Sequence, residues 1–219
     1  MARILITGAT RGIGRALFDA YTARGDDVTG TYRDTAPTGG SWARLDVTEA
    51  GDLRNLKTAM GDRPLDLLIC NAGVYLDKGH HLADGYDASL WAETFATNVT
   101  GVFQTIQTLL PNLAHSNAGK IVIMSSQMAS SERAPGGSYI YRASKAAVLN
   151  LGRNLASELK PRHIAVGIYH PGWVQTDMGG GNADISAEDS RDGLMARFDA
   201  LTMASSGEFK TWDGVDHPY

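Results

Sequence analysis

Short apolar runs alternate with longer segments of helical periodicity along most of the chain. The runs that we expect to form strands cover residues 3–7, 27–33, 43–47, 65–70, 120–125, 165–169 and 208–212. Between them, apolar residues recur at helical spacing at about 13–24, 49–60, 88–113 and 139–160. Strands that alternate with helices of this length are typical of βαβ units with a parallel sheet. The pattern therefore predicts an α/β fold with one doubly wound parallel sheet, a Rossmann-type arrangement of three α/β/α layers.

The last part of the chain adds a glycine-rich segment and one more helix. Three glycines at 179–181 indicate a flexible connection, and Ser186 fits the first position of a helix-start capping pattern. The helix after it carries apolar residues at i, i+4 and i+7, which predicts a core-facing stripe: Leu194, Phe198 and Leu201. No repeat, linker or low-complexity segment divides the sequence. We expect a single domain over residues 1–219, with a substrate segment at about 177–204.

Composition and charge exclude several classes of function. The 219 residues carry 20 Lys or Arg against 24 Asp or Glu, a formal charge of −4, whereas nucleic-acid binding needs clustered basic residues. No apolar run approaches the ~18 residues of a membrane span. The single cysteine, Cys70, allows no disulfide within the chain, and no Cys/His cluster has metal-ligand spacing. We expect a cytoplasmic protein that binds no nucleic acid, no membrane and no metal.

A glycine-rich turn follows the first predicted strand and opens the first predicted helix. Its glycines, Gly8, Gly12 and Gly14, have the spacing G-x-x-x-G-x-G. Glycine lets the backbone turn tightly and approach a pyrophosphate, and the amides at a helix N-terminus favour that anion. Glycine spacing alone is weak support and also fits a purely structural turn. Its position between a strand and a helix predicts a dinucleotide site.

The choice of nucleotide depends on the end of the second predicted strand. NAD sites commonly place an acid there, whereas NADP sites offer an arginine to the 2′-phosphate. Arg33 lies about there, and Arg11 lies inside the glycine turn. Two guanidiniums can hold a dianionic phosphate through charge-assisted hydrogen bonds. The sequence therefore favours NADP(H), and the neighbouring Asp34 leaves NAD(H) open.

A tyrosine and a lysine are four residues apart on the helix predicted over 139–160. Tyr141 and Lys145 therefore share one face, whereas Tyr139, six residues from Lys145, points elsewhere. A phenol with a pKa of about 10 is a poor proton shuttle at neutral pH. An ammonium and an oxidised nicotinamide nearby would stabilise the phenolate and lower that pKa. Because this spacing is common on helices, the pair indicates a catalytic site only in combination with other motifs of the chain.

Further motifs accompany this pair. A serine-rich strand end lies at 124–126, an Asn-Ala-Gly run at 71–73, an asparagine at 98, and a Pro-Gly pair at 171–172. Together with the glycine turn, these residues resemble the short-chain dehydrogenase/reductase family over nearly the whole chain. The stretch 139–145 and the closing residues 207–214 are most similar to the C-factor-type branch of that family.

The resemblance implies hydride transfer between NADP(H) and a small carbonyl compound or secondary alcohol. Tyr141 would be the acid in reduction and the base in oxidation, and Lys145 would lower its pKa and bind the nicotinamide ribose. Ser126 would stabilise charge on the substrate oxygen, and Asn98 would hold a water that links Lys145 to solvent. The other implied cofactor contacts are Gly8, Thr10, Arg11, Gly12, Ile13, Gly14 and Arg33; Asp46 and Val47 at the adenine; Asn71, Ala72 and Gly73 at the adenosine ribose; and Pro171, Gly172, Val174 and Thr176 at the nicotinamide.

Two assignments have alternatives. The loop from Ser126 to Tyr141 is longer than the commonest family spacing, so Ser125 and Ser130 are rivals of Ser126 for the catalytic serine. Ser126 is preferred because it directly follows the apolar strand run. Trp173 fits either a wall of the substrate site or the core.

A second function is also possible on the sequence alone. An NADP(H)-binding regulatory or signalling protein with little turnover would agree with the short substrate segment and the C-factor resemblance. An intact Ser, Tyr, Lys and Asn set argues against it, since a sensor needs no proton donor. Similar family members pair through their long helices, so the resemblance implies a homodimer or homotetramer. The substrate itself is not encoded in a readable motif.

Overall fold

Seven parallel strands form one sheet in the computed structural model, which describes all residues from 1 to 219. The strand order is β3-β2-β1-β4-β5-β6-β7, and every neighbouring pair is parallel. The strands are β1 Arg3–Ile6, β2 Asp27–Tyr32, β3 Ser41–Arg44, β4 Leu67–Cys70, β5 Lys120–Met124, β6 Ala165–His170 and β7 Phe209–Thr211. The predicted α/β fold class is confirmed.

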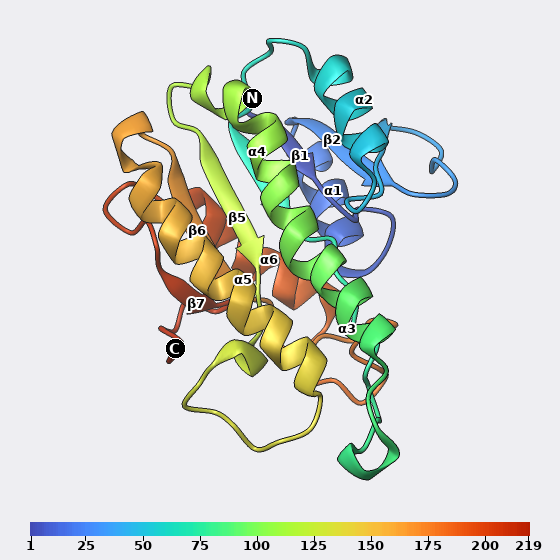
Figure 1. Cartoon of the computed structure of the whole chain (residues 1–219). Helices are drawn as coiled ribbons and strands as arrows, with labels where there is room; N and C mark the ends of the chain where they lie inside the picture. Colours follow the sequence, from blue (N-terminus) through green and yellow to red (C-terminus); the bar gives the residue numbers. More distant parts are fainter.

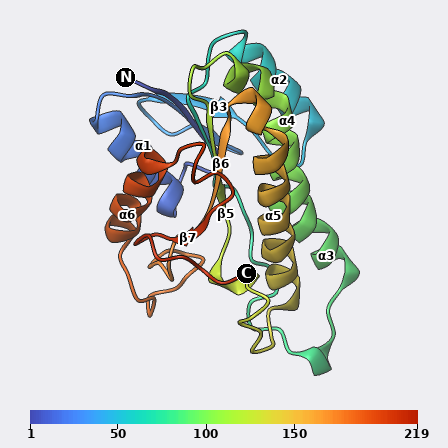
Figure 2. The ribbon, with the colours of Figure 1, turned by 90° about the vertical axis from the view of Figure 1, so that its left-hand side faces the viewer.

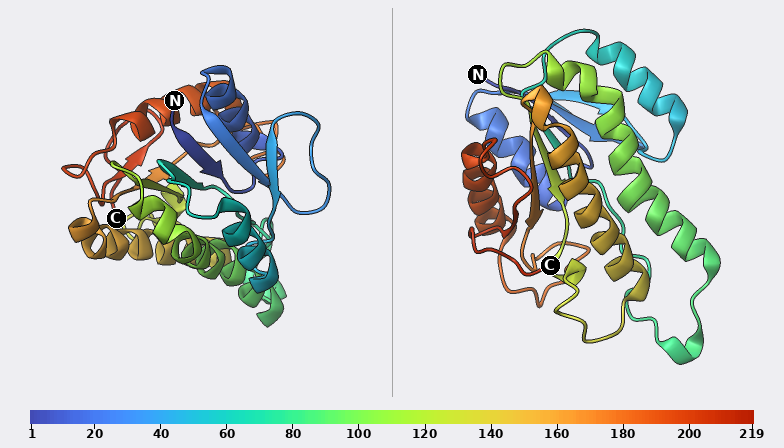
Figure 3. Two further views of the ribbon diagram at one scale, coloured as in Figure 1. Left: turned by 90° about the horizontal axis from the view of Figure 1, so that it is seen from above. Right: turned by 60° about the vertical axis from the view of Figure 1, so that its left-hand side comes forward.

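Helices cover both faces of this sheet (Figures 1 and 2). One face carries α1 (Gly12–Ala23) and α6 (Ala187–Ala200), and the other carries α2 (Ala50–Met60), α4 (Gly101–Ala114) and α5 (Tyr139–Glu158). α3 (Ala88–Phe95) leads into α4 through a π-helical turn, Ala96–Thr100, and projects away from the sheet (Figure 3). Short 3₁₀ turns lie at Leu82–Asp84, Gln127–Ala129 and Lys160–Arg162. None of these helices has the length and apolar character needed to cross a membrane.

The central strands are continuous apolar runs because both of their faces are buried. Every residue of β4 and β6 is buried, because helices cover both faces of a parallel sheet and its inner strands become continuous apolar runs. The edge strand β3 has no fully buried residue. α5 packs closely on β6 at Gly152, where a Cβ would lie 2.6 Å from Ile168 Cγ1. This close packing fixes α5, the helix that carries Tyr141 and Lys145, against the sheet.

Several element boundaries differ from the predictions. Residues 88–113 form α3, the π turn and α4 rather than one regular helix, because the π turn takes up one extra residue within the helical run. The third strand begins at Ser41 instead of residue 43 and ends at Arg44, since Trp42 stacks on Phe18 at 4.3 Å between ring centroids. β4 begins at Leu67 instead of residue 65.

The helix expected after residue 186 is present as α6. Ser186 Oγ accepts a hydrogen bond from the Asp189 amide at 3.0 Å, which caps the helix. The predicted stripe is buried and packs on the α1 side of the sheet: Leu194, Phe198 and Leu201. The apolar face of α6 therefore belongs to the core, and the substrate segment at about 177–204 stays a prediction.

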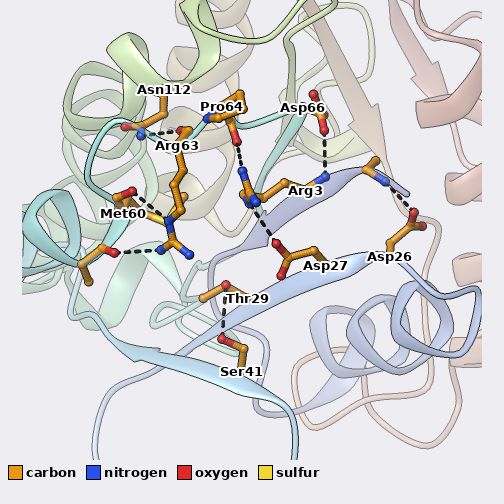
Figure 4. Close-up of polar contacts among 12 residues, drawn as sticks. Arg3, Asp26, Asp27, Thr29, Ser41, Met60, Arg63, Pro64, Asp66 and Asn112 are labelled. Atoms are coloured by element: carbon orange, nitrogen blue, oxygen red, sulfur yellow. Dashed lines mark hydrogen bonds and ion pairs between the residues drawn. The ribbon is translucent and has the colours of Figure 1, made fainter.

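The amino ends of β1 and β2 are held by polar contacts (Figure 4). Arg3 Nε donates to Asp27 Oδ2 at 2.8 Å, and Arg3 Nη1 donates to the Pro64 carbonyl at 3.0 Å. Arg63 donates to two carbonyls at the end of α2, those of Ala59 and Met60. A cavity of about 120 Å³ lies among these residues. It opens at the amino edge of the sheet, so these contacts stabilise the edge opposite the strand carboxyl ends.

The strand order reverses between β1 and β4. β1 is followed by α1 on one face, whereas β4 is followed by α3 and α4, and α4 lies on the other face. In open α/β sheets, ligands bind outside the carboxyl ends of the strands at such a reversal. The glycine turn after β1 and residues 71–73 after β4 both lie at this point. The fold thus brings two of the predicted motifs to one crevice.

Candidate active site

The glycine turn contains two residues in the left-handed conformation. Gly8 has a φ of 64° and Gly12 a φ of 55°, values that residues with a side chain rarely adopt. α1 begins without a side-chain cap and without an acid in its first turn. Its first amides therefore lack side-chain partners and, together with the helix dipole, favour an anion. This arrangement fits the pyrophosphate of a dinucleotide.

Asn71 connects the glycine turn to the end of β4. Its Nδ2 donates to the carbonyl oxygens of Thr7 at 3.1 Å and Gly8 at 3.0 Å. Thr7 Oγ1 accepts the backbone amides of Asn71 and Ala72, both at 3.0 Å. The side chain of Asn71, which the family resemblance assigns to the adenosine ribose, thus holds two loops of the crevice together.

Gly14 has no room for a side chain. A Cβ there would lie 2.3 Å from the Gly8 carbonyl oxygen and 2.5 Å from Asn71 Nδ2. We expect Gly14→Ala to destabilise the fold by about 1–3 kcal/mol, the usual cost of overpacking, and to weaken NADPH binding because the turn must shift. Thermal unfolding and titration of NADPH fluorescence measure the two effects.

Gly51→Ala is the matched control. Gly51 is also a helical glycine, and its Cβ would meet only Arg54 Nη2, at 3.8 Å. It should gain about 0.5–1 kcal/mol from the better helix propensity of alanine and leave NADPH binding unchanged. A Gly14→Ala protein with unaltered stability and unaltered NADPH affinity would contradict the steric argument.

The two arginines expected at the 2′-phosphate differ in their surroundings. Arg11 Nη1 pairs with Asp177 Oδ2 at 2.7 Å, and both side chains are exposed. Arg33 is exposed and forms no ion pair. Arg33 is therefore free to meet an anion, whereas Arg11 would exchange Asp177 for it.

Asp46 lies at the carboxyl end of the neighbouring edge of the sheet, after β3. Burial alone would raise its pKa, but hydrogen bonds from Thr48 and the positive charges of Arg33 and Arg44 lower it. Its carboxylate accepts the Thr48 amide at 2.9 Å and the Thr48 hydroxyl at 2.7 Å. Asp46 is thus held as an anion in a fixed position, which suits an acceptor for an adenine amino group.

The other expected cofactor residues differ in their burial and in their contacts. Val47 is buried, and a Cβ on Gly101 would lie 2.6 Å from its Cγ2, so its side chain packs against the start of α4. Thr176 reaches the glycine turn, since a Cβ on Gly12 would lie 3.3 Å from its Cγ2. Thr10 is exposed, and Ile13 is half-buried against the core on the α1 side of the sheet. The Pro171 carbonyl accepts a hydrogen bond from the Ser190 hydroxyl. Gly172 has a φ of 90°, and Val174 is buried.

Tyr141 and Lys145 lie on one face of α5. Lys145 Nζ is 5.6 Å from the centroid of the Tyr141 ring, and both side chains are buried. Lys145 Nζ also donates to the Met124 carbonyl at the end of β5, at 2.9 Å. Burial lowers the pKa of Lys145 to about 8. Tyr139 points away from this pair, as expected, and contacts Tyr86 edge-on at 5.5 Å between ring centroids.

The pKa of Tyr141 differs from the sequence-based expectation. Burial raises it, the Ser126 hydroxyl lowers it, and the nearby Tyr75 and Asp77 raise it further. Without a cationic nicotinamide, the protein alone therefore keeps the phenol protonated at neutral pH.

The three candidate serines have different partners. Ser125 Oγ donates to the Lys145 carbonyl at 3.1 Å, and Ser130 Oγ donates to the Tyr219 carbonyl at 3.3 Å. Ser126 Oγ accepts the Met128 amide at 3.1 Å, which leaves its hydroxyl proton available. Since Ser126 also acts on the pKa of Tyr141, the geometry favours Ser126 as the serine beside the tyrosine.

Asn98 is buried inside the π-helical turn, a local feature frequent at functional sites. Its Nδ2 donates to the Val74 carbonyl at 2.9 Å and to Ser144 Oγ at 3.0 Å, and its Oδ1 accepts the Val74 amide at 2.8 Å. The side chain thus has no proton left to donate to a water. A Cβ on Gly73 would lie 3.2 Å from Asn98 Oδ1 and 3.5 Å from Lys145 Nζ, so Asn98 and Lys145 border the same narrow space.

A family model described as short chain dehydrogenase matches residues 2–185. The chain belongs to the short-chain dehydrogenase family. The resemblance inferred from the motifs is therefore confirmed, and the seven-stranded sheet is that of a short-chain dehydrogenase.

Individual relatives of this short-chain dehydrogenase agree with the C-factor-like branch. The C-signal protein of Myxococcus xanthus is 36% identical over 169 residues, which cover 76% of this chain and 100% of that protein. The 3-oxoacyl-[acyl-carrier-protein] reductase FabG of Salmonella typhimurium is 29% identical, with 93% of this chain and 84% of FabG covered. Among solved structures, NADPH-bound carbonyl reductase from chicken fatty liver superimposes with a TM-score of 0.91 at 26% identity, covering 100% of this chain and 99% of that one.

Two residues of this short-chain dehydrogenase's site were not foreseen. Tyr75 stacks on Tyr141 with ring centroids 4.2 Å apart, and the carboxylate of Asp77 accepts the amides of Ile140 and Tyr141. Both lie in the irregular loop after β4, where sequence has no periodicity to indicate direction. Trp173, which fitted either core or substrate wall, is 46% exposed and donates to the Gly179 carbonyl at 2.9 Å, so it does not belong to the core.

Proposed function

We propose that this short-chain dehydrogenase is an NADP(H)-dependent oxidoreductase that reduces a carbonyl compound or oxidises a secondary alcohol. The observation that carries the proposal is the buried Tyr141, with Lys145 on the same helix face and Ser126 beside it. These groups lie at the carboxyl edge of the sheet, where the glycine turn offers an anion site. A buried proton donor beside a dinucleotide crevice suits hydride transfer coupled to proton transfer.

The side chains would divide the chemistry as follows. Ser126 would donate a hydrogen bond to the substrate oxygen, where negative charge develops, and Tyr141 would transfer the single proton to that oxygen. Lys145, with a pKa of about 8, is mainly cationic at pH 7 and would stabilise the phenolate and bind the nicotinamide ribose. The nicotinamide supplies the hydride when it is bound. In alcohol oxidation, the same groups would act in reverse.

A preference for NADP(H) over NAD(H) is part of the proposal. It is supported by Arg33, whose guanidinium is exposed and forms no ion pair, and by similar solved structures that contain NADPH or NADP. A 2′-phosphate near Arg33 and Arg11 would gain charge-assisted hydrogen bonds that NADH cannot make. Formation of a homodimer or homotetramer remains a prediction from the family resemblance.

The direct test is an assay of the purified protein with NADPH and a panel of aldehydes, ketones and diketones. We expect loss of nicotinamide absorbance with at least one class of carbonyl compound, and slower turnover with NADH. The reverse reaction, secondary alcohols with NADP⁺, should appear with the product of any active carbonyl. Tight NADPH binding without turnover on any member of either panel would argue against the oxidoreductase.

A second candidate function is regulatory binding of NADP(H) with little turnover. The observation in its favour is the similarity to a protein named C-signal, which covers that protein's full length. The buried tyrosine and lysine argue against it, because a protein that only senses a nucleotide has no use for a proton donor. A binding partner that depends on NADP(H), together with inactivity in the assay above, would support it.

A further inference from the structure

The first turn of α5 is capped from a distant part of the chain. Ser138 precedes the helix, but its backbone is left-handed, with a φ of 48°, and its side chain makes no capping bond. The amides that an N-cap side chain normally satisfies are those of the second and third helical residues, here Ile140 and Tyr141. Asp77 takes this role: its Oδ2 accepts the Ile140 amide at 2.8 Å and its Oδ1 accepts the Tyr141 amide at 3.2 Å.

The cap comes from the loop after β4, which also contacts the tyrosine ring. Tyr75 stacks on Tyr141 and is hydrogen-bonded through its hydroxyl to Ser138. Asp77 has no exposed surface and forms no ion pair. Burying a carboxylate without a cation is costly, and the two amide hydrogen bonds offset part of that cost. The loop after β4 and the start of α5 therefore form one unit around Tyr141.

We propose that Asp77 is a positioning residue for Tyr141, which it aims at the substrate oxygen by holding the first turn of α5 from the opposite loop. The inference rests on the proposed function, because it assigns the purpose of this cap to the tyrosine's proton transfer. One of the two amides that Asp77 accepts is that of Tyr141 itself, and the other is that of the preceding residue, Ile140.

The charge of Asp77 supplies a signature that a neutral cap would lack. The titratable groups that face Tyr141 are Tyr75 and Asp77 from the loop after β4 and Lys145 from its own helix, and Ser126 adds a neutral hydroxyl. Asp77 opposes ionisation of the phenol, so replacing it by a neutral acceptor should lower the pKa of Tyr141. In alcohol oxidation, where the phenolate is the active form, the rate should then rise at lower pH.

The first experiment compares the wild type with Asp77→Asn, Asp77→Glu and Asp77→Ala. We expect Asp77→Ala to lower kcat about 10²-fold, a loss that a misplacement on the order of 1 Å can cause, with NADPH affinity unchanged. In Asp77→Asn, the midpoint of the pH profile for oxidation should fall, because a negative charge that opposes ionisation of the phenol is removed. Asp77→Glu keeps the charge, so its midpoint should stay at the wild-type value although kcat falls. A midpoint that is identical in the wild type and Asp77→Asn would overturn the proposal, and if that variant does not fold, Asp77→Ser decides in its place.

Hydrogen exchange followed by mass spectrometry tests the same proposal without turnover. Asp77→Ala should speed exchange in the peptide that spans Ser138 to Lys145. The matched control is Asp87→Asn, because Asp87 is the exposed cap of α3 and accepts the Ser89 amide at 2.8 Å; it should leave exchange in α5 and the pH profile unchanged. If the wild type proves inactive, the proposed function fails while exchange still tests the cap. Unchanged exchange at the start of α5 in Asp77→Ala would reject Asp77 as the positioning residue.

Discussion

Replacement of Tyr141 by phenylalanine is expected to lower kcat/KM for carbonyl reduction by about 10²–10⁴-fold, the usual contribution of a positioned acid or base. The ring keeps its stacking on Tyr75, at 4.2 Å between centroids, and only the hydroxyl is lost. NADPH affinity should change little, because the glycine turn and Arg33 are untouched. Steady-state rates in both directions and an NADPH titration measure the separation between binding and catalysis.

Tyr139→Phe is the control for this substitution. Tyr139 loses the same atom two residues earlier on α5, but its ring is partly exposed and contacts Tyr86. Its rate should equal that of the wild type. Equal rates in Tyr141→Phe and Tyr139→Phe would remove Tyr141 from the mechanism, whereas loss of NADPH binding in Tyr141→Phe would indicate a structural role.

Replacement of Lys145 by methionine should have two opposite effects. Catalysis should fall by about 10²–10³-fold, as expected when a fixed electrostatic group is removed. Stability should rise, because burial holds the pKa of Lys145 at about 8 against 10.5 for the free side chain, which corresponds to about 3 kcal/mol. The lost hydrogen bond to the Met124 carbonyl removes about 1 kcal/mol of that gain. A net gain of about 2 kcal/mol near neutral pH is the expected result.

The gain should depend on pH in a definite direction. Below pH 8 the lysine is charged in both the folded and unfolded states, so the wild type bears the full cost of burying the charge. As the pH rises from about 8 to 10.5, the folded lysine loses its proton first, and the wild type gains stability relative to Lys145→Met. Denaturant unfolding of both proteins across this range measures the difference, and other groups cancel because both proteins contain them.

Lys120→Met provides the contrast. Lys120 Nζ donates to the carbonyls of Phe198 at 3.1 Å and Asp199 at 2.8 Å, at the end of α6. Burial also lowers the pKa of Lys120, so Lys120→Met relieves a cost of burying charge as well, but it breaks two hydrogen bonds where Lys145→Met breaks one. Any gain in stability should therefore be smaller than that of Lys145→Met, and activity should stay intact. If Lys145→Met were less stable than the wild type near pH 7, the cost assigned to the buried ammonium would be wrong.

Local patterns were enough to predict the architecture of this chain. The apolar runs of β4 and β6 indicated inner parallel strands because covered strands are apolar on both faces. The glycine turn after β1 and the four-residue spacing of Tyr141 and Lys145 are local properties too, so both were readable. The π turn at residues 96–100 was not, because the chain is helical on both sides of it and no residue type marks the extra residue.

The sequence by itself determined the α/β sheet, the family and the helix face that carries Tyr141 and Lys145, because each follows from residues near one another in the chain. Only the tertiary structure decided the partners of those residues. Asp77 is more than sixty positions from the amides it caps, and Arg11 meets Asp177 from across the crevice. Burial, which raises the pKa of Tyr141 and lowers that of Lys145, likewise arises only when both faces of the sheet are covered. These long-range contacts and the exclusion of water set the protonation of the site, and no spacing along the chain encodes them.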